Sequence, residues 1–286
     1  VANAHSVDVY DVQDWTRLRR LGNPNPRALA FDRQGNLYVA DDHANTVTVY
    51  ARGKTTRLRT IKAGLDAPNS MAFDSSGNLY VSNNNNKSVT VYAPGSGAVL
   101  RTITDGINGP HDVIFDASGN LYVGNNGSSH ITVYPPGGTH VIRTIITHNG
   151  PLALAFDGAG DLFCVNNFNV TVYKPGKTQP DRTITNGISL PSTLAFDPAG
   201  NLYVANWGTN MFRSTIAVYG PGGSTPHKTI GDGVGYPLSL VFDNAGRLYV
   251  ANSGFNTVTI YAPGASKPER TLTNGIVAPR VLTFGP

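Results

Sequence analysis

One phrase of twelve residues occurs six times along the chain, and this repeat constrains the fold more than any other feature. Its first copy, from Ala30 to Asp41, reads Ala-Phe-Asp-Arg-Gln-Gly-Asn-Leu-Tyr-Val-Ala-Asp. A proline precedes the phrase, and a Thr-Val-Thr-Val-Tyr run and an Arg-Thr-Ile run follow it. The tyrosines that end the Thr-Val-Thr-Val-Tyr runs are 40, 42, 42, 39, 46 and 42 residues apart. A period of about 40 to 45 residues with four strand-like runs predicts a β-propeller, in which each repeat forms one blade.

Each repeat is expected to form a sheet of four strands. In the first complete repeat these are the run that ends at Phe31, residues 37–41, residues 46–50 and the run that begins at Arg59. The Asp-x-x-Gly-Asn segment between the first two strands predicts a hairpin turn, because glycine takes the positive φ angle that such turns require. The Thr-Val-Thr-Val-Tyr run alternates polar and apolar side chains, as a half-buried strand does.

The two ends of the chain match parts of one further repeat. Residues 1–3 match the end of a second strand, residues 7–10 match a third strand, and residues 282–284 match a first strand. Joining the two ends in one blade would remove the open sheet edges that invite aggregation.

The sequence therefore predicts a single domain over residues 1–286, an all-β, seven-bladed β-propeller with four-stranded blades. Six blades are expected to be complete. The seventh is expected to be shared between the N- and C-termini and composed of residues 1–20 and 280–286.

Composition excludes several other classes of protein. Hydrophobic residues make up 40% of the 286 residues and charged residues 14%, so the chain can build a large core and is not disordered. The net charge of +4 comes without a long basic cluster, which argues against nucleic-acid binding. No apolar run reaches about 18 residues, so no membrane span is expected. The low charge and the many Asn, Thr and Gly residues favour an extracytoplasmic protein, secreted or periplasmic, and we expect a monomer.

The full repeat resembles the NHL repeat. It reads Pro-x-x-(Leu/Met)-Ala-Phe-Asp-x-x-Gly-Asn-Leu-Tyr-Val-Ala-(Asn/Asp)-x-x-x-Asn-x-Val-x-Val-Tyr, and the chain is similar over essentially its whole length to bacterial NHL-like propellers. These are neighbours of the gluconolactonase/regucalcin-like and virginiamycin B lyase-like propellers. The resemblance implies the propeller fold but selects no function, because such propellers include enzymes, receptors and scaffolds. It implies a metal-binding glutamate in the lactonases and a His/Glu pair in the lyases, and the one glutamate here, Glu269, matches neither.

Binding is expected on the top face, where the loops before the first strands and between the second and third strands lie. The residue after each repeat proline is expected at the top mouth of the central channel. Arg280, Arg27, Asn69 and His111 occupy this place in consecutive repeats and form a polar arc. Two arginine side chains suit a carboxylate or a phosphate. The alternative is that these are ordinary solvated loop residues.

An aromatic surface is a second candidate on the same face. Trp207 lies in the longest loop between a second and a third strand, an insertion that explains the spacing of 46 residues. With Tyr236 and Phe168 in flanking loops, it could present rings to a sugar or an apolar ligand. The alternative is a tryptophan that anchors its loop against its own blade.

The last residue of each second strand is an amide or an acid, which we interpret as structural. Such side chains satisfy backbone groups in the following turn. The one acid, Asp41, is followed by Asp42 and His43, and together they are the densest cluster of possible metal ligands. A divalent cation is the one cofactor that they could hold; the alternative, a hydrated acidic loop, is preferred, so no metal site is predicted. The amides are Asn3, Asn83, Asn125, Asn166, Asn206 and Asn252.

One cation recurs on each fourth strand, the outermost strand of the blade. We interpret these charges as protection of exposed strand edges, with polyanion binding as the alternative. The cations are Arg19, Arg59, Arg101, Arg143, Arg182, Lys228 and Arg270.

We therefore expect a non-catalytic binding or interaction propeller that uses the top face around the channel mouth. The expected partner is a small anionic molecule, an acidic glycan or a protein. The alternatives are a lyase or a lactone or ester hydrolase of the propeller type, with or without a metal ion, and a structural repeat scaffold. The expected ligand-binding residues are Arg27, Asn69, His111 and Arg280, with Trp207 or Tyr236 as a wall.

Overall fold

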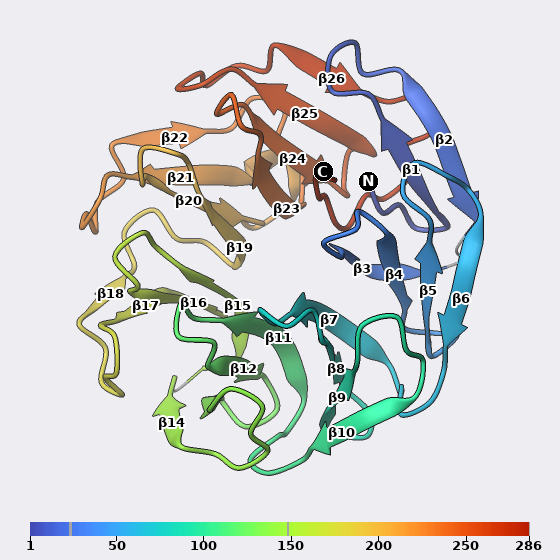
Figure 1. Ribbon diagram of the computed structural model, residues 1–286. Coiled ribbons are helices and arrows are strands. Elements are labelled where there is room, and N and C mark those ends of the chain that lie inside the picture. Colours follow the sequence, from blue (N-terminus) through green and yellow to red (C-terminus); the bar gives the residue numbers. More distant parts are fainter. Residues whose placement is uncertain (23–24, 148, 286) are drawn as a thin grey trace. The chain divides into compact units, whose positions relative to one another are not determined.

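The computed structural model describes residues 1–22, 25–147 and 149–285, and nearly all of its regular structure is β. Within these residues the strands form six four-stranded sheets and one two-stranded sheet, and each four-stranded sheet follows the chain order (Figure 1). The chain is a β-propeller with four-stranded blades. Its contacts divide it into two compact units. Unit 1 contains Val1–Ala4, Asp8–Arg19 and Ala155–Phe284, and unit 2 contains His5–Val7, Arg20–Leu154 and Gly285–Pro286.

Unit 2 holds three complete blades. The first contains β3 (Pro26–Phe31), β4 (Leu37–Asp41), β5 (Thr46–Tyr50) and β6 (Arg57–Ile61). The second contains β7 (Pro68–Phe73), β8 (Leu79–Asn83), β9 (Ser88–Tyr92) and β10 (Val99–Ile103). The third contains β11 (Pro110–Phe115), β12 (Leu121–Asn125), β13 (His130–Tyr134) and β14 (Arg143–Ile146).

Unit 1 holds the later blades and one short helix. β15 (Pro151–Phe156), whose first residues belong to unit 2, is followed by β16 (Leu162–Asn166), β17 (Val170–Tyr173) and β18 (Arg182–Ile184). The next blade contains β19 (Pro191–Phe196), β20 (Leu202–Asn206), the 3-10 helix η1 (Met211–Arg213), β21 (Thr215–Tyr219) and β22 (Lys228–Ile230). The last contains β23 (Pro237–Phe242), β24 (Leu248–Asn252), β25 (Thr257–Tyr261) and β26 (Arg270–Leu272).

The prediction of seven four-stranded blades is wrong, because the described residues form six. The terminal segments form only a two-stranded sheet, β1 (Ser6–Tyr10) with β2 (Arg17–Gly22), and an isolated bridge between Ala2 and Val281.

The reason lies in how few backbone groups the terminal segments can exchange. Val1 and Asp8 exchange two backbone hydrogen bonds of 2.8 and 2.9 Å, and Ala2 donates its N–H to Val281 O at 2.8 Å. Leu282 then donates its N–H to a serine hydroxyl of β23 instead of continuing a ladder. Residues 282–285 consequently form no strand, and Pro286 lies outside the described residues.

Neighbouring blades pack against each other through pairs of aromatic side chains. Tyr38 of β4 meets Phe73 of β7 edge to face, with ring centroids 5.1 Å apart and planes at 80°. Each such pair contributes about 0.5–1.5 kcal/mol beyond the buried area. The repeated twelve-residue phrase therefore supplies both rings of each pair. The Tyr comes from the second strand of one blade and the Phe from the first strand of the next. The equivalent pairs are Tyr80–Phe115, Phe163–Phe196, Tyr203–Phe242 and Tyr249–Phe284.

In four blades the tyrosine that ends the third strand bonds to the loop that leads into its own blade. Tyr92 donates its hydroxyl to Ala63 O at 2.5 Å, and Tyr261 donates to Asp232 O at 2.6 Å. Tyr134 and Tyr219 make the same bond to equivalent loops. Burial raises the pKa of all four phenols from 10.0 to about 12.

These tyrosines make the fold sensitive to alkali. The folded pKa is raised, so above about pH 10 the unfolded state loses phenolic protons that the folded state keeps, and the free energy of unfolding falls as the pH rises toward about 12. Denaturant unfolding across this range should show the fall, and Tyr92→Phe should reduce it. Ultraviolet absorbance measures the ionisation of the tyrosines. If it shows that all tyrosines of the folded protein ionise near pH 10, this packing is contradicted.

Candidate functional site

In five blades the residue after the repeat proline is the extra residue of a β-bulge on the first strand. Pro26 pairs with Asp41 and Ala28 pairs with Ala40, so Arg27 has no partner in the ladder. Asn69 and His111 are bulged in the same way in the next two blades of unit 2. A bulge changes the direction of the side chain of its extra residue. Here the side chain reaches the following blade.

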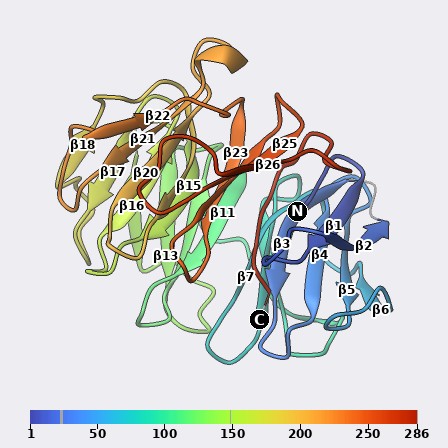
Figure 2. The same cartoon turned by 90° about the horizontal axis from the view of Figure 1, so that it is seen from above.

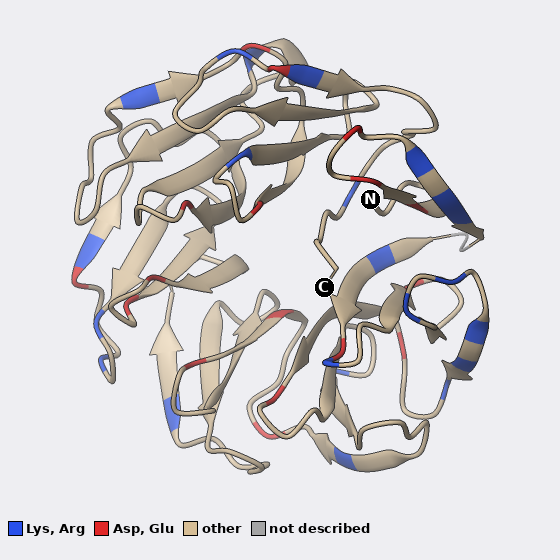
Figure 3. Cartoon of the chain, turned by 45° about the horizontal axis from the view of Figure 1, so that its top comes forward, with Lys and Arg blue, Asp and Glu red and all other residues tan. Residues whose placement is uncertain are grey.

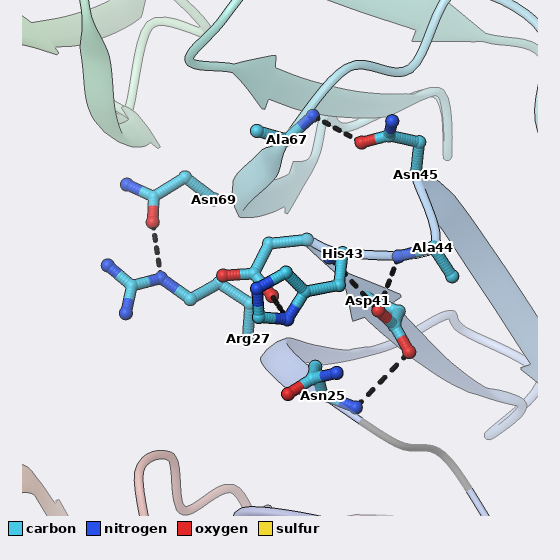
Figure 4. A network of polar contacts seen from close by, with 9 residues as sticks. Asn25, Arg27, Asp41, His43, Ala44, Asn45, Ala67 and Asn69 are labelled. Atoms are coloured by element: carbon cyan, nitrogen blue, oxygen red, sulfur yellow. Dashed lines mark hydrogen bonds and ion pairs between the residues drawn. The ribbon is translucent and has the colours of Figure 1, made fainter.

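In unit 2 these bulged residues form a row of hydrogen bonds from blade to blade. Arg27 donates from Nε to Asn69 Oδ1 at 2.5 Å (Figure 4). Asn69 donates from Nδ2 to His111 O at 2.8 Å, and His111 Nδ1 lies 2.7 Å from Leu152 O. Because a carbonyl only accepts, His111 carries its proton on Nδ1. Three of the predicted site residues are thus brought together, half-buried, and each helps to join two blades.

Asp112, the neighbour of His111, bonds to both flanking blades. Its Oδ1 accepts from Ser70 Oγ at 2.9 Å, and its Oδ2 accepts from the N–H of Leu154 at 2.9 Å. Burial lowers the pKa of His111, the carboxylate of Asp112 opposes this effect, and the positive charge of Arg27 adds to it. His111 therefore stays neutral in the folded protein near neutral pH.

The Asp41 cluster is held by backbone groups. Asp41 Oδ1 accepts from the N–H groups of His43 at 3.1 Å and Ala44 at 2.8 Å, and Oδ2 accepts from the N–H of Asn25 at 3.2 Å (Figure 4). His43 Nδ1 lies 3.8 Å from Asp42 Oδ1 at the surface. In the part of the chain that the structure describes, no three or more His, Cys, Asp or Glu side chains are grouped to hold a metal ion.

The structural interpretation of the amides at the ends of the second strands is confirmed. Asn83 Oδ1 accepts from the N–H of Asp66 at 3.1 Å, and Asn83 Nδ2 donates to Thr90 Oγ1 at 3.0 Å. The expected partner was only partly right, since this acceptor serves the loop before the first strand and not the following turn. The same loop contact is made by Asn125, Asn206 and Asn252.

Unit 1 carries a group of four aromatic residues at its surface, which we call the aromatic cluster: Trp207 and Phe212, which are exposed, and Tyr236 and Phe255, which are half-buried. The rings of Trp207 and Tyr236 are 5.8 Å apart, and those of Phe212 and Phe255 are 5.9 Å apart. Phe212 belongs to η1, the short coil that stands out beyond its sheet in Figure 2. Its side chain is 79% exposed.

The loop that carries the cluster is fixed by its own hydrogen bonds. Asn210 caps η1 by accepting from the N–H of Phe212 at 3.0 Å. Ser214 donates from Oγ to Trp207 O at 2.7 Å and accepts from the N–H of Tyr236 at 3.0 Å. Trp207 donates from Nε1 to Pro237 O at 3.1 Å. The tryptophan thus anchors the loop, as the alternative held, although to the next blade and not to its own.

The sequence interpretation found only part of this cluster. Trp207 and Tyr236 lie together as predicted, while Phe168 is an exposed side chain of another turn. Phe212 and Phe255 were missed, although both lie in turns between a second and a third strand, the class of loop already singled out. Arg280 belongs to unit 1, where its N–H donates to Ala2 O at 2.8 Å. Its grouping with Arg27 stays a prediction.

Comparisons with known proteins show the fold and no family. No protein-family model matches the chain, and no curated protein sequence matches it. Among solved structures, Kuenenia stuttgartiensis hydrazine synthase is similar, with a TM-score of 0.69, 20% sequence identity, and coverage of 82% of this chain and 76% of that chain. This likeness supports the β-propeller, while the NHL-like family expected from the sequence is not confirmed. Among the described residues, no helix has the length and apolar character to span a membrane.

The half-buried position of His111 between two blades predicts a loss of stability in acid. Its folded pKa is lowered below the ordinary value of 6.5, so protons bind the unfolded state preferentially and the free energy of unfolding falls as the pH drops below 6.5. His111→Asn keeps a donor near the place of Nδ1 and should reduce this fall. His43→Asn, at a side chain that is 75% exposed, should leave it unchanged. The free energy of unfolding is measured by urea titration at each pH. If it falls equally steeply with pH below 6.5 in the wild type and in His111→Asn, the prediction is wrong.

Proposed function

We propose that the chain is a non-catalytic binding module that holds an acidic glycan on the aromatic cluster of unit 1. The observation that carries this proposal is the exposure of Phe212 on a hydrogen-bonded insertion, in a chain whose other loops are short and repetitive. An aromatic ring left in water is unfavourable for the free protein. Its retention on a rigid loop favours a role in binding.

The loop geometry supports recognition without rearrangement. The bonds from Asn210 and Ser214 fix the backbone on both sides of η1, so little conformational entropy is lost when a ligand is bound. The paired rings of Phe212 and Phe255 and of Trp207 and Tyr236 offer apolar surface of the kind against which the apolar faces of sugar rings pack.

The charge near the cluster favours an acidic ligand. Arg213 follows Phe212 directly at the end of η1 and is exposed, and the whole chain carries a net charge of +4. A guanidinium binds carboxylate and sulfate groups through paired hydrogen bonds. The cluster itself consists of aromatic side chains with no carboxylate, imidazole or thiol, which favours binding over the lyase or hydrolase alternatives.

A small carboxylate beside Arg27 is a second candidate in unit 2. The bond from Nε to Asn69 holds the guanidinium of Arg27 in a defined orientation next to a neutral His111, and this preorganisation favours an anion over a cation. We rank it second because Asn69 and His111 are already used in contacts between blades.

Isothermal titration with oligogalacturonate and heparin oligosaccharides, and with neutral cello-oligosaccharides, tests the first proposal. Phe212→Ala removes one stacking ring worth about 1.5 kcal/mol and should weaken binding of the acidic probes about tenfold. Arg213→Ala should weaken only the acidic probes and reduce their salt dependence.

Phe168→Ala is the matched control, because it removes another exposed phenylalanine from unit 1 outside the cluster. It should leave binding unchanged. Failure of both acidic probes to bind, or an equal loss in Phe168→Ala and Phe212→Ala, would contradict the proposal.

A further inference from the structure

The outermost strand of each blade begins with a β-bulge, and one residue per blade occupies it. Ile142 donates its N–H to Val133 O at 2.9 Å, although Val133 is paired with Arg143. The equivalent N–H bonds of Asp181, His227 and Glu269 are 2.8, 3.0 and 2.8 Å long. In β6 and β10 the register shift leaves Leu58 and Leu100 in the same place. We call this position the bulge slot.

The bulge slot holds different chemistry in the two units. In unit 2 it holds Leu58, Leu100 and Ile142, whose side chains are 50%, 51% and 59% exposed. In unit 1 it holds polar residues, Asp181, His227 and Glu269, which are also exposed. Because the same bulge forms with an acid or a histidine, an aliphatic side chain is not required for folding. The three aliphatic side chains of unit 2 are therefore available for a contact with another molecule.

The residue before the bulge slot differs in the same way. In unit 1 it is Pro180, Pro226 or Pro268, and in unit 2 it is Arg57, Val99 or Val141. The N–H of the residue in the bulge slot points to the third strand. Because successive N–H groups of a strand point to opposite sides, the N–H of the preceding residue points away from the sheet, to the open edge. Proline removes this donor and blocks the edge.

The strands themselves follow the same division between the units. β18, β22 and β26 have three residues each, whereas β6 and β10 have five and β14 has four. The edges of unit 1 are therefore short and blocked, while those of β6 and β10 are longer and open to a further strand. In the blade of β14 the N–H of Val141 already donates to Asp105 Oδ2 at 2.9 Å.

The edge at β6 is also strongly basic. Residues 43–65 contain five cations and neither Asp nor Glu. Figure 3 shows such basic residues, in blue, along the outermost strands. Arg59 packs on its own blade, with Nη2 donating to Tyr38 Oη at 2.6 Å, but Arg57 and Lys62 are exposed at the two ends of the strand. Two copies of the chain that paired through β6 would bring like charges together, so the charge favours an acidic occupant.

We propose that the open edge of β6, with Leu58 beside it, docks an extended acidic segment of a partner protein. The segment adds as a fifth strand to the four-stranded sheet of β3 to β6, so that its backbone pairs with β6 and its carboxylates meet Arg57 and Lys62. An aliphatic side chain of the segment packs on Leu58. This surface is separate from the aromatic cluster, and its test does not depend on glycan binding.

Capped synthetic peptides of about eight residues, the length of an ordinary strand, are the probes. One alternates Asp and Val, the second alternates Lys and Val, and the third is the Asp-Val peptide with a central proline. We expect only the first to bind in fluorescence anisotropy, more weakly as salt is added, and to slow hydrogen exchange of the amides of β6.

The decisive variant is Arg57→Pro with Leu58→Glu, which copies Pro268 and Glu269 of unit 1 and should fold for that reason. It should weaken the Asp-Val peptide at least tenfold. Lys177→Glu, at an exposed turn of unit 1, changes the net charge by the same amount and should not weaken it. If the double variant fails to fold, Leu58→Glu alone should weaken the peptide.

Four results would overturn the proposal. They are no binding of the Asp-Val peptide, equal binding of the lysine or proline peptide, unchanged binding by the folded edge variant, and equal weakening by Lys177→Glu. Self-association of the wild type that the edge variant abolishes would identify a second copy as the occupant. Binding to anionic vesicles without peptide binding would identify a membrane surface. Either of these outcomes also shows that the proposal of an acidic partner segment is wrong.

Discussion

In four blades a buried side-chain amide at the end of the second strand holds the blade to the loop that leads into it, and the rest of the structure depends on this contact. Asn252 accepts the N–H of Gly235 at 3.0 Å and donates to Thr259 Oγ1 at 2.9 Å. One side chain thus joins the entry loop, the second strand and the third strand. Without it, a buried N–H would lack an acceptor, at a cost of about 1–3 kcal/mol. The loop held in this way carries Tyr236, a member of the aromatic cluster.

Two bulges per blade then separate the residues that build the sheet from those that are free to vary. The bulged residue of the first strand is Arg27, Asn69 or His111 in unit 2, and that of the fourth strand is Leu58 in β6. Neither is paired with a residue of the neighbouring strand, so its identity changes between blades without loss of pairing. Differences between blades at these positions reflect contacts outside the sheet, and the repeats of one chain serve as controls for one another.

The sequence predicted the strands well because their side chains have a clear periodicity. The predicted strands at 37–41 and 46–50 coincide with β4 and β5. The blade count was wrong because motif matching counted residues 282–284 as a strand, whereas whether a ladder forms depends on which backbone groups remain unpaired. Only Ala2 was left to pair with Val281.

Only those residues of the candidate site that stand out by their amino-acid type could be predicted from the sequence. Trp207 stood out by its rarity and its long loop, and its proximity to Tyr236 followed from the repeat. The bulges could not be read from the sequence, since a repeat shows which residues are equivalent but not which one leaves the ladder. For that reason Asn69 and His111 were expected to face a ligand, and the structure shows them bonded to the following blade.

Hydrogen exchange at the amide of Gly235 tests the central role of the buried side chain most directly. In the wild type this N–H should exchange as slowly as the amides of β24, because its acceptor Asn252 is fully buried. In Asn252→Ala it should exchange at least about tenfold faster, a change of about 1.4 kcal/mol in local stability, while the amide of Asp66, held by Asn83 in unit 2, stays protected. Fast exchange of Gly235 in the wild type, or unchanged protection in Asn252→Ala, would contradict the account.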